Sequence, residues 1–463
     1  MKLSEILDLP EGVRDLDVTR VEIDSRRCQP GDVFFAMPGR SDDGRQFIND
    51  AVANGASVVV TTDTYAATVP VIVVPASSLH ATLVRACQAV TGHPERSVRL
   101  LGVTGTNGKT SVTTIFAQMW RALGHDADVI GTLTHERTTP APPELFRELA
   151  RVRDLSHGPD TAVALEVSSH ALTQGRVDGV VFDVAVFTNL SLDHLDYHHS
   201  MEEYFAAKSQ LFDSARCQHA VVFTDDPYGQ RLSDAIGVPV TRVHRRDATD
   251  VVSTSAGTTF RWRGCDVSSP LRGSFNVDNA LLAMTSAVVL GASPRDVAEA
   301  MSDVARVPGR FDVVRDASPT VVVDYAHTPD GLLRVLRDAR EIAGAGRLIV
   351  VFGCGGERDA SKRPVMGRIA GDEADVVVIT SDNPRSEDPE AIISEILAGV
   401  DEGVVVHRDA DRRGAIEWAL RSAALDDVVV IAGKGHEKTQ LVGPHVLEFD
   451  DRVVVADILG ASN

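Results

Sequence analysis

The stretch from residue 98 to residue 110, VRLLGVTGTNGKT, decides the fold of the middle of this chain. A short apolar run leads into a glycine-rich turn that ends in Gly108-Lys109-Thr110, and the residues from Ser111 to Leu123 carry a helical pattern. A phosphate-binding loop needs this order of strand, glycine turn and helix. Glycines let backbone N–H groups crowd around phosphates, and the helix N-terminus adds partial positive charge.

The spacing of the glycines is irregular for such a loop. The strict pattern G-x-x-x-x-G-K-T would place its first glycine at position 103, which is Val103, whereas the glycines here are Gly102, Gly105 and Gly108. The alternative interpretation is an ordinary glycine turn before a helix. If the loop binds phosphate, the lysine at position 109 reaches the terminal phosphates and the threonine at position 110 ligates Mg²⁺.

Length and composition narrow the class of protein. A chain of 463 residues is too long for one core, so two to four domains are expected. Apolar residues make up 43% and aromatic residues only 5%, which is typical of an aliphatic α/β protein. The formal net charge of −20 argues against non-specific binding to nucleic acid or to an anionic membrane.

Cysteine usage and hydropathy indicate the compartment. The five cysteines are scattered and form no C-x-x-C pair, so neither a disulfide framework nor a structural zinc site is expected. The first residues lack the pattern of a secretory signal, and no apolar run approaches the roughly 20 residues that a membrane helix requires. We therefore expect a soluble, cytoplasmic protein.

The chain alternates between strand-like and helix-like segments. Turn formers at 91–94 and 307–310 suggest domains at 1–92, 93–309 and 310–463. The Thr- and Ser-rich segment 251–270 predicts antiparallel strands. The other strands are expected at 58–61, 71–74, 162–167, 180–187, 321–325, 348–352, 376–381 and 428–432, and helices at 47–54, 75–90 and 275–290. This order predicts doubly wound α/β domains with mostly parallel sheets.

Polar clusters follow two of the central strands. Glu166 and His170 come after one strand, and the segment 187–198, FTNLSLDHLDYH, comes after the next. Carboxylates and imidazoles beside a phosphate loop suggest Mg²⁺ ligation, and the alternative is capping and turn chemistry at strand ends. A helix is expected at 204–212, YFAAKSQLF, where composition alone favours a solvated surface position for Lys208.

Four further clusters follow strands of the C-terminal part, so they converge on one sheet edge. They are DYAHTPD at 324–330, FGCGGERD at 352–359, SDNPR at 381–385 and AGKGHE at 432–437. Glycines with mixed charges suit a small zwitterionic ligand. Arg385 has the geometry to hold a carboxylate with two hydrogen bonds, and Glu437 the charge to receive an ammonium group.

Ten motifs in order resemble the Mur ligases of peptidoglycan synthesis, and most of all the members that add diaminopimelate. The match runs from about Asp24 to Asp451, through GTNGKT, EVSSHAL, FTNLSLDHLDYH, YFAAKSQLF, NVDNALLA, VPGRFD, DYAHTPD, FGCGGERD, SDNPRSEDP and GKGHE. The resemblance implies three domains: a UDP-binding N-terminal domain, a central ATPase domain and a C-terminal Rossmann-like domain. It also implies ATP and Mg²⁺ as cofactors.

The resemblance further implies a reaction. ATP phosphorylates the D-glutamate side-chain carboxylate of UDP-MurNAc-L-Ala-D-Glu, and the amine of meso-diaminopimelate then attacks the acyl phosphate and expels phosphate. A carboxylate is a poor electrophile until one of its oxygens becomes a phosphate leaving group, and cations must neutralise the charge that builds up. The protein is expected to act as a monomer, with no nucleic-acid or membrane partner.

By position, the resemblance implies roles for individual residues. Catalytic roles fall to Lys109, Lys208, His194 and Arg310. The expected ATP-binding residues are Gly105, Thr106, Asn107, Gly108, Lys109, Thr110, Ser111, Asn279, Arg310 and Asp324. The expected metal ligands are Thr110, Glu166, His194 and a carbamylated Lys208. Contacts to the UDP-linked substrate are implied for Ser25, Arg26, Thr138, Thr139, Ser168, Gln174 and Arg176, and contacts to the added amino acid for Asp382, Asn383, Pro384, Arg385, Gly433 and Glu437.

Departures from the family pattern leave alternatives open. The chain is several residues shorter than usual between Gly131-Thr132 and Thr138-Thr139-Pro140, the usual DGH is Asp43-Gly44-Arg45, and Thr439 replaces an aromatic residue. The short loop raises the alternative of a paralogue that ligates an amino acid to a different carboxylate. An L-lysine-adding ligase is another alternative, although lysine would leave Arg385 unpaired. A regulatory protein without ligase activity would need a broken catalytic set.

Overall fold

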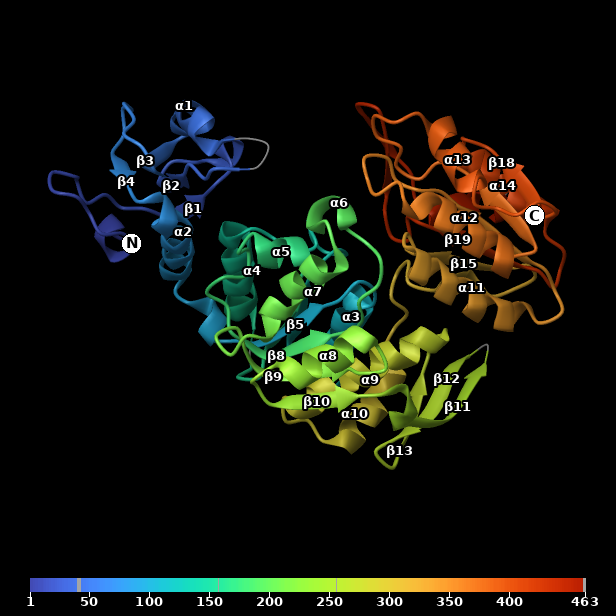
Figure 1. Ribbon diagram of the computed structural model, residues 1–463. Coiled ribbons are helices and arrows are strands. Elements are labelled where there is room, and N and C mark those ends of the chain that lie inside the picture. Colours follow the sequence, from blue (N-terminus) through green and yellow to red (C-terminus); the bar gives the residue numbers. More distant parts are fainter. Residues whose placement is uncertain (40–42, 157, 255, 461–463) are drawn as a thin grey trace.

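The computed structural model describes residues 1–39, 43–156, 158–254 and 256–460. Three α/β units follow one another along the chain, and each has its own sheet (Figure 1). The N-terminal and C-terminal units lie on either side of the central unit, which contacts both. Among the described residues, no helix is both long and apolar enough to cross a membrane.

The N-terminal unit is a small parallel sheet with the strand order β1-β2-β3-β4. Its strands are β1 (Arg20–Glu22), β2 (Asp32–Phe35), β3 (Ala56–Thr61) and β4 (Val71–Val73). Helix α1 (Ile48–Ala53) follows β2, and the long helix α2 (Ala76–Thr91) leads out of the unit. α2 ends at Gly92, whose φ of 71° favours glycine, so the turn residues at 91–94 end a helix as predicted.

The central unit is a six-stranded parallel sheet with the order β10-β9-β8-β5-β7-β6. The phosphate-loop strand β5 (Arg99–Thr104) therefore lies inside the sheet, between β7 (Ala162–Glu166) and β8 (Phe182–Phe187). The remaining strands are β6 (Ala127–Ile130), β9 (Cys217–Phe223) and β10 (Val240–Val243). An antiparallel sheet follows, formed by β11 (Ala248–Thr254), β12 (Gly257–Trp262) and β13 (Cys265–Ser269), as the Thr- and Ser-rich segment predicts.

Alternate residues of the central strands bury both faces of the sheet. Leu101 and Val103 face helices α3 (Lys109–Ala122), α9 (Ser274–Val289) and α10 (Pro294–Ala300), whereas Leu100 lies in the core on the other side. That other face is covered by α4 (Pro142–Leu155), α5 (Ser169–Thr173), α7 (Met201–Ser209) and α8 (Pro227–Ala235); the short α6 (Leu195–His198) precedes α7. The two cores hold the carboxyl end of β5, and with it the glycine loop, in a fixed position.

The C-terminal unit has the sheet order β14-β15-β19-β16-β17-β18, with only β14 antiparallel. Its strands are β14 (Asp312–Arg315), β15 (Thr320–Asp324), β16 (Leu348–Phe352), β17 (Val376–Ile379), β18 (Val405–Arg408) and β19 (Val428–Ala432). Helices α11 (Pro329–Ala343), α12 (Lys362–Glu373) and α13 (Pro389–Leu397) cover one face, and α14 (Arg412–Ser422) and α15 (Asp451–Gly460) cover the other. The hairpin of β20 (Thr439–Val442) and β21 (His445–Glu448) lies beside the loop after β17, where Val442 pairs with Arg385.

The four polar clusters of this unit follow β15, β16, β17 and β19. These strands are consecutive and parallel in the sheet, in the order β15-β19-β16-β17. Their carboxyl ends therefore meet at one edge, as predicted. This edge faces the phosphate loop of the central unit, since Asp330 after β15 accepts a hydrogen bond from the Asn107 amide at 3.1 Å. The two sheets thus present their carboxyl ends to a common space.

Candidate active site

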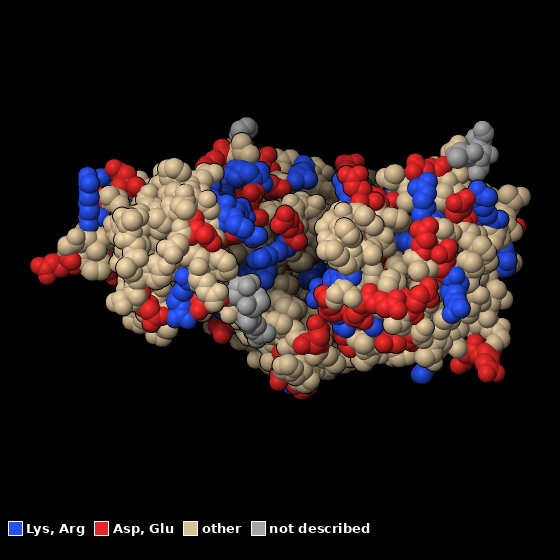
Figure 2. Space-filling model, turned by 90° about the horizontal axis from the view of Figure 1, so that it is seen from above, with Lys and Arg blue, Asp and Glu red and all other residues tan. Residues whose placement is uncertain are grey.

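A cavity of about 350 Å³ lies between the central and C-terminal units. Its walls come from the loops after β5, β7 and β8 on one side and after β15, β16, β17 and β19 on the other. Seen from above, Lys and Arg side chains gather around the hollow in the middle of the molecule, although the net charge of the chain is −20 (Figure 2). The cavity wall carries both signs of charge: cations such as Lys109, Arg310 and Lys362 are available to phosphates, and carboxylates stand beside them.

The glycine loop has no room for side chains where it turns. Gly105 has a φ of 148°, and a Cβ there would overlap the Thr188 hydroxyl, while Gly108 has a φ of 88° and faces Asn279. The Thr188 hydroxyl donates to the Asn107 carbonyl at 2.6 Å. Helix α3 then begins at Lys109, so its free N–H groups point toward the cavity side of the loop. The irregular spacing thus still forms a tight glycine turn between a strand and a helix N-terminus, the geometry that the phosphate-loop prediction requires.

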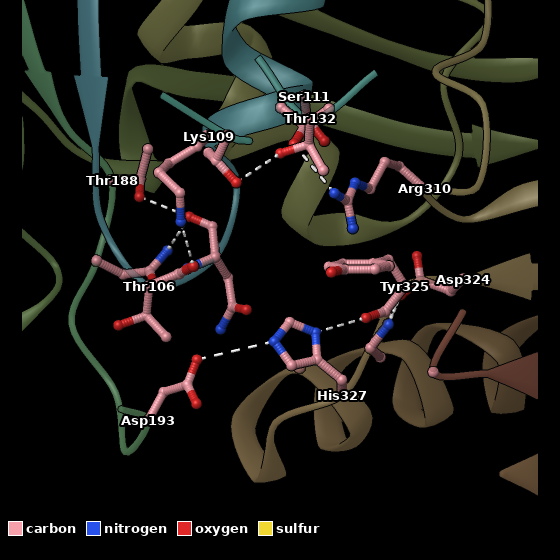
Figure 3. A pocket seen from close by; sticks show the side chains of 18 of the residues that line it. Thr106, Lys109, Ser111, Thr132, Thr188, Asp193, Arg310, Asp324, Tyr325 and His327 are labelled. Atoms are coloured by element: carbon pink, nitrogen blue, oxygen red, sulfur yellow. Dashed lines mark hydrogen bonds and ion pairs between the residues drawn. The ribbon is translucent and has the colours of Figure 1, made fainter. Parts of the chain in front are cut away.

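Two lysines, one fully buried and one partly exposed, converge on the same carbonyl of this loop. The Lys109 ammonium donates to the Gly105 and Thr106 carbonyls, both at 2.8 Å, and the Lys208 ammonium donates to Gly105 at 2.7 Å (Figure 3 shows the bonds of Lys109). Lys208 is fully buried beneath the loop, so the surface position favoured by composition is wrong. It lies one turn after Tyr204 and shares that residue's buried face, with its ammonium 4.5 Å from the Tyr204 ring centre.

The surroundings of the two lysines lower the pKa of both. Burial lowers the pKa of Lys109 below its ordinary value. Burial lowers the pKa of Lys208 further, and the charge of Lys109 adds to this effect. Lys208 thus differs chemically from an exposed lysine, because a larger fraction of it is an unprotonated nucleophile at neutral pH.

Glu166, at the end of β7, ties the glycine loop to the loop after β6, and Thr110 contacts the opposite domain. It accepts hydrogen bonds from the hydroxyls of Thr110 at 3.0 Å and Thr132 at 3.1 Å, and from the Thr132 N–H at 2.9 Å. Arg310 of the C-terminal unit donates to the Thr110 hydroxyl at 3.0 Å, and its guanidinium lies 4.2 Å from the Tyr325 ring centre (Figure 3). A threonine hydroxyl beside a carboxylate is a suitable ligand pair for a hard cation.

The loop after β8 supplies Asp193 and His194. Burial lowers the pKa of His194 to about 3, so this imidazole is neutral at pH 7. Asp193 lies 3.5 Å from the His194 ring nitrogen and 3.8 Å from that of His327. Although burial alone would raise it, the pKa of Asp193 is held well below its ordinary value by His327 and His194.

The predicted metal ligands are only partly brought together. Thr110 and Glu166 are in direct contact, whereas Lys208 lies under the loop and bonds to Gly105. In the described part of the chain, no three His, Cys, Asp or Glu residues are grouped closely enough to hold a metal ion by themselves. The metal roles of Thr110, Glu166, His194 and Lys208 stay predictions, and a cation bound here would need further oxygens, such as those of phosphates.

The other predicted nucleotide residues also line the cavity, namely Thr106, Asn107, Gly108, Ser111, Asn279, Arg310 and Asp324. Asn279 is fixed by a hydrogen bond to the Asn276 side chain at 3.0 Å. Asp324 accepts from the N–H groups of Phe311 and Ala326 at 2.6 and 2.7 Å, and burial raises its pKa. Phe275, Leu282 and Val335 add apolar wall. The cavity thus combines a polar end at the glycine loop with an apolar surface.

Most of the residues predicted to bind the added amino acid form the far wall of the same cavity. The Asn383 amide donates to Glu437 at 2.9 Å, and the Lys434 ammonium donates to the same carboxylate at 2.9 Å. Arg385 has a φ of 54°, and its guanidinium donates to the Gly356 carbonyl at 2.6 Å. Within the described part of the chain, no carboxylate lies within ion-pair distance of Arg385. Its guanidinium is therefore available to an acidic ligand.

Three further predicted residues surround this pocket. Asp382 is buried, burial raises its pKa, and its Oδ2 atom has no hydrogen-bond partner in the structure. A Cβ at Gly433 would lie 2.6 Å from that oxygen, so glycine is needed there. Pro384 does not line the cavity, but its carbonyl packs against Gly356. Pro384 therefore shapes the pocket from behind.

The predicted contacts to the UDP-linked substrate divide between two cavities. Thr138 and Ser168 line the first, while Thr139 lies behind it and donates to the Glu166 carbonyl at 2.8 Å. Arg176 donates to the Thr139 carbonyl at 2.9 Å and to the Gln174 side chain at 2.7 Å, so these two support the wall without lining it.

Ser25 and Arg26 line a second cavity, of about 700 Å³, between the N-terminal unit and α4. The short loop joins the two cavities, because Thr132 and Thr138 border the first while Glu136 and Arg137 border the second. A substrate that fills both would pass along this loop.

Sequence reasoning missed several residues of the cavity. Tyr325 and His327 lie in the quoted motif DYAHTPD, so their position after a strand was a usable signal. Thr132 precedes the shortened loop. Lys362 lies in no quoted motif, and only the packing of α12 against the cavity places it there.

Three family models match the chain. They are described as the Mur ligase family catalytic domain (residues 17–100), the Mur ligase middle domain (103–287) and the Mur ligase glutamate ligase domain (309–435). Among curated relatives, the UDP-N-acetylmuramoyl-L-alanyl-D-glutamate–2,6-diaminopimelate ligase of Geobacillus kaustophilus is 43% identical, over 95% of this chain and 94% of the relative. The enzyme of that name from Chromobacterium violaceum is 43% identical, over 96% and 95%.

Solved structures agree with the sequence relatives. One of a UDP-N-acetylmuramoyl-L-alanyl-D-glutamate–2,6-diaminopimelate ligase is 32% identical, covers 100% of this chain and 99% of its own, and has a TM-score of 0.67. A MurF ligase from Thermotoga maritima in complex with ADP shares the fold at 17% identity, with a TM-score of 0.68 over 97% and 98% of the two chains. Both the family models and the full-length relatives lead to one conclusion: the chain belongs to the Mur ligase family.

Proposed function

We propose that this protein is an ATP-dependent amide ligase. It joins meso-2,6-diaminopimelate to the D-glutamate side-chain carboxylate of UDP-MurNAc-L-Ala-D-Glu in peptidoglycan synthesis. The observation that carries the proposal is the single cavity that joins the phosphate loop of Gly105–Thr110 to the pocket of Asn383, Arg385 and Glu437. The relatives at about 43% identity, named for this reaction, give the substrates.

The first step activates the carboxylate. The loop amides and Lys109 hold the terminal phosphate of ATP, and Arg310 faces it from the opposite domain. A carboxylate oxygen of the substrate attacks the terminal phosphorus, the bond to the bridging oxygen breaks, and its electron pair leaves with ADP. Bound Mg²⁺ supplies charge neutralisation for the phosphates, and Thr110 with Glu166 would hold it. Lys109, Arg310 and Mg²⁺ favour the transfer because they face the negative charge that develops on the phosphoryl oxygens in the transition state.

The second step forms the amide. The neutral amine of diaminopimelate attacks the carbonyl carbon of the acyl phosphate. The tetrahedral intermediate expels inorganic phosphate, which takes the proton that the amine loses. Arg385 is proposed to hold the distal carboxylate of the amino acid, and Glu437, with Asn383, its ammonium group. Lysine lacks the distal carboxylate and would leave the Arg385 guanidinium without an acidic partner, which disfavours it.

Lys208 is proposed to be carbamylated, as the family resemblance implies. Carbamate formation needs a neutral amine to attack CO₂, and burial beneath the loop favours the neutral form. The product is an anion beside Lys109, so it would satisfy the charge of that lysine and provide oxygens for a cation.

A phosphate-release assay tests the proposal. The protein is mixed with ATP, Mg²⁺ and UDP-MurNAc-L-Ala-D-Glu, and either meso-diaminopimelate or L-lysine is added. We expect release with meso-diaminopimelate and little with lysine. Release only with lysine, or with neither amino acid, would contradict the proposal.

Both cavities are formed within one chain, so we expect a monomer to be active. The use of ATP fits the cytoplasmic location predicted from the sequence.

The second candidate is a paralogue with the same chemistry on another carboxylate. The short loop between Gly131 and Pro140 favours it, because this loop borders both cavities. Calorimetry with UDP-MurNAc-L-Ala-D-Glu separates the two candidates. Micromolar binding supports the muramoyl substrate, whereas an active ATPase that does not bind it supports the paralogue.

A further inference from the structure

Lys362 is a buried cation that faces the cavity. It is the first residue of α12, only 8% of its side chain is exposed, and it lines the cavity wall. The nearest carboxylate oxygen, Oδ1 of Asp193, is 3.8 Å from its ammonium, which is too far for a hydrogen bond. Within the described residues the ammonium has no hydrogen-bond acceptor. Its three N–H donors are therefore available to a group bound in the cavity.

Another buried lysine of the same unit shows what a structural lysine looks like here. The Lys434 ammonium donates to Asn383 at 3.2 Å, to Glu437 at 2.9 Å and to the Thr439 carbonyl at 2.7 Å, so all three of its protons are used. Lys109 and Lys208 also donate to backbone carbonyls. Of these four lysines, Lys362 is the one whose N–H donors have no acceptor in the described part of the chain and face the cavity.

The position of Asp193 places Lys362 opposite the phosphate loop. Asp193 belongs to the central unit, and its charge is close enough to act on both Lys109 and Lys208. Figure 3 shows Asp193 on the same side of the cavity as Thr106 and Lys109, with His327 of the C-terminal unit facing it. Lys362 reaches the same carboxylate from the C-terminal unit. Lys109 of the central unit and Lys362 of the C-terminal unit thus both lie near the Asp193 carboxylate.

We propose that Lys362 binds the phosphoryl group while it passes from ATP to the substrate carboxylate. This inference rests on the proposed function. The transferred group spreads negative charge over three equatorial oxygens. Lys109 reaches it from the loop side, Arg310 reaches it from the C-terminal unit, and Lys362 takes an oxygen from the start of α12. The ammonium stays protonated and moves no proton. Without the phosphoryl group, Asp193 offers the charge nearest to Lys362.

The test compares Lys362→Met, Lys362→Gln and Lys362→Arg with Arg368→Met, which removes an exposed cation from the same helix. Equilibrium dialysis measures labelled ADP with Mg²⁺ and UDP-MurNAc-L-Ala-D-Glu, with and without aluminium fluoride, a mimic of the phosphoryl group in transfer. No amino acid is present. We expect Lys362→Met to bind ADP within about twofold of wild type and to lose at least about tenfold of the gain from aluminium fluoride. Lys362→Arg should keep part of the gain.

Steady-state kinetics give the second readout. For Lys362→Met we expect kcat to fall about 100-fold or more, with KM for diaminopimelate within about threefold of wild type. Thermal unfolding checks that the variants fold, and Lys362→Gln serves if the Met variant does not. Arg368→Met should behave as wild type in all three measurements.

Three results would overturn the inference. Equal gains from aluminium fluoride in wild type and Lys362→Met would exclude a phosphoryl contact. A raised KM for diaminopimelate at unchanged kcat would assign Lys362 to a carboxylate of the amino acid. Recovery of activity in Asp193→Asn/Lys362→Met would mean that Lys362 only balances Asp193. An inactive wild type contradicts the proposed function instead, so the two failures are distinguishable.

Discussion

At the scale of single residues, burial decides which charged groups are reactive. Lys208 follows Tyr204 by one turn, and the sequence YFAAKSQLF places both on one helix face. That spacing was visible in the sequence, but the depth of the face beneath the Gly105 loop was not, because it depends on how α7 packs against β5 and β8. Composition therefore favoured solvent, and packing placed the lysine in the core.

Replacing Lys208 tests its proposed carbamate. We expect Lys208→Met to lower kcat by about 100-fold or more, since the anion beside Lys109 is lost. In wild type supplied with ¹³C-bicarbonate, carbon NMR should show a carbamate signal that persists to lower pH than for an exposed lysine, because burial lowers the pKa of Lys208. Lys2→Met, at an exposed position, is the control. A fully active Lys208→Met variant would exclude the role.

Arg385 should determine the choice of amino acid. Its guanidinium contacts only backbone carbonyls in the described part of the chain, so a distal carboxylate would be its first acidic partner. We expect Arg385→Ala to raise KM for meso-diaminopimelate about 10- to 100-fold and to leave KM for ATP unchanged. Arg421→Ala, an exposed arginine on α14, is the matched control. An unchanged KM for diaminopimelate would show that another residue holds the carboxylate.

At the scale of elements, the sequence predicted the strands well and the walls of the site only in part. Apolar runs that end in polar residues gave β7, β8, β15, β16, β17 and β19 to within a few residues, because buried parallel strands have no exposed face to interrupt the run. Thr132 and Lys362 were missed, since neither stands in a pattern of its own. Each enters the cavity through the packing of its element on a neighbour.

The glycine loop shows why backbone geometry, and not the exact motif, matters. We expect Gly105→Ala to weaken ADP binding at least about tenfold and to lower the unfolding temperature, because its φ is 148° and a Cβ would overlap the Thr188 hydroxyl. Gly237→Ala is the control, since a Cβ there meets nothing within 4 Å. Fluorescence titration with labelled ADP and a thermal scan measure both effects. Wild-type affinity in Gly105→Ala would mean that the loop adopts another conformation in solution.

At the scale of the whole molecule, contacts between units complete the site. Arg310 reaches Thr110, and Asn107 reaches Asp330, across the space between the central and C-terminal sheets. Neither sheet alone forms the cavity, so activity depends on how the units are held together. The domain boundaries at 92/93 and 309/310 stay predictions. The nearest element ends are Thr91 of α2 and Asp312 of β14.

The contact of His80 with Asp178 makes the attachment of the N-terminal unit depend on pH. His80 lies on α2, and its ring is 3.1 Å from the Asp178 carboxylate of the central unit. This hydrogen bond raises the pKa of His80 above 6.5. The pKa of Asp178 lies below its ordinary value in spite of burial, because the His80 ring hydrogen-bonds to it and the Arg216 guanidinium is paired with it at 2.7 Å, so Asp178 stays ionised near neutrality.

A group whose folded pKa is raised stabilises the fold fully below its unfolded pKa and loses that contribution as pH rises through the folded value. The unfolding temperature of wild type should therefore fall more than that of His80→Gln between about pH 5.5 and about pH 8.5. Both side chains are about one-third exposed, so the contribution is below about 1 kcal/mol. Differential scanning calorimetry measures it, with His445→Gln on the exposed β21 as control. Identical pH slopes in wild type and His80→Gln would show that the N-terminal unit is held without this ion pair.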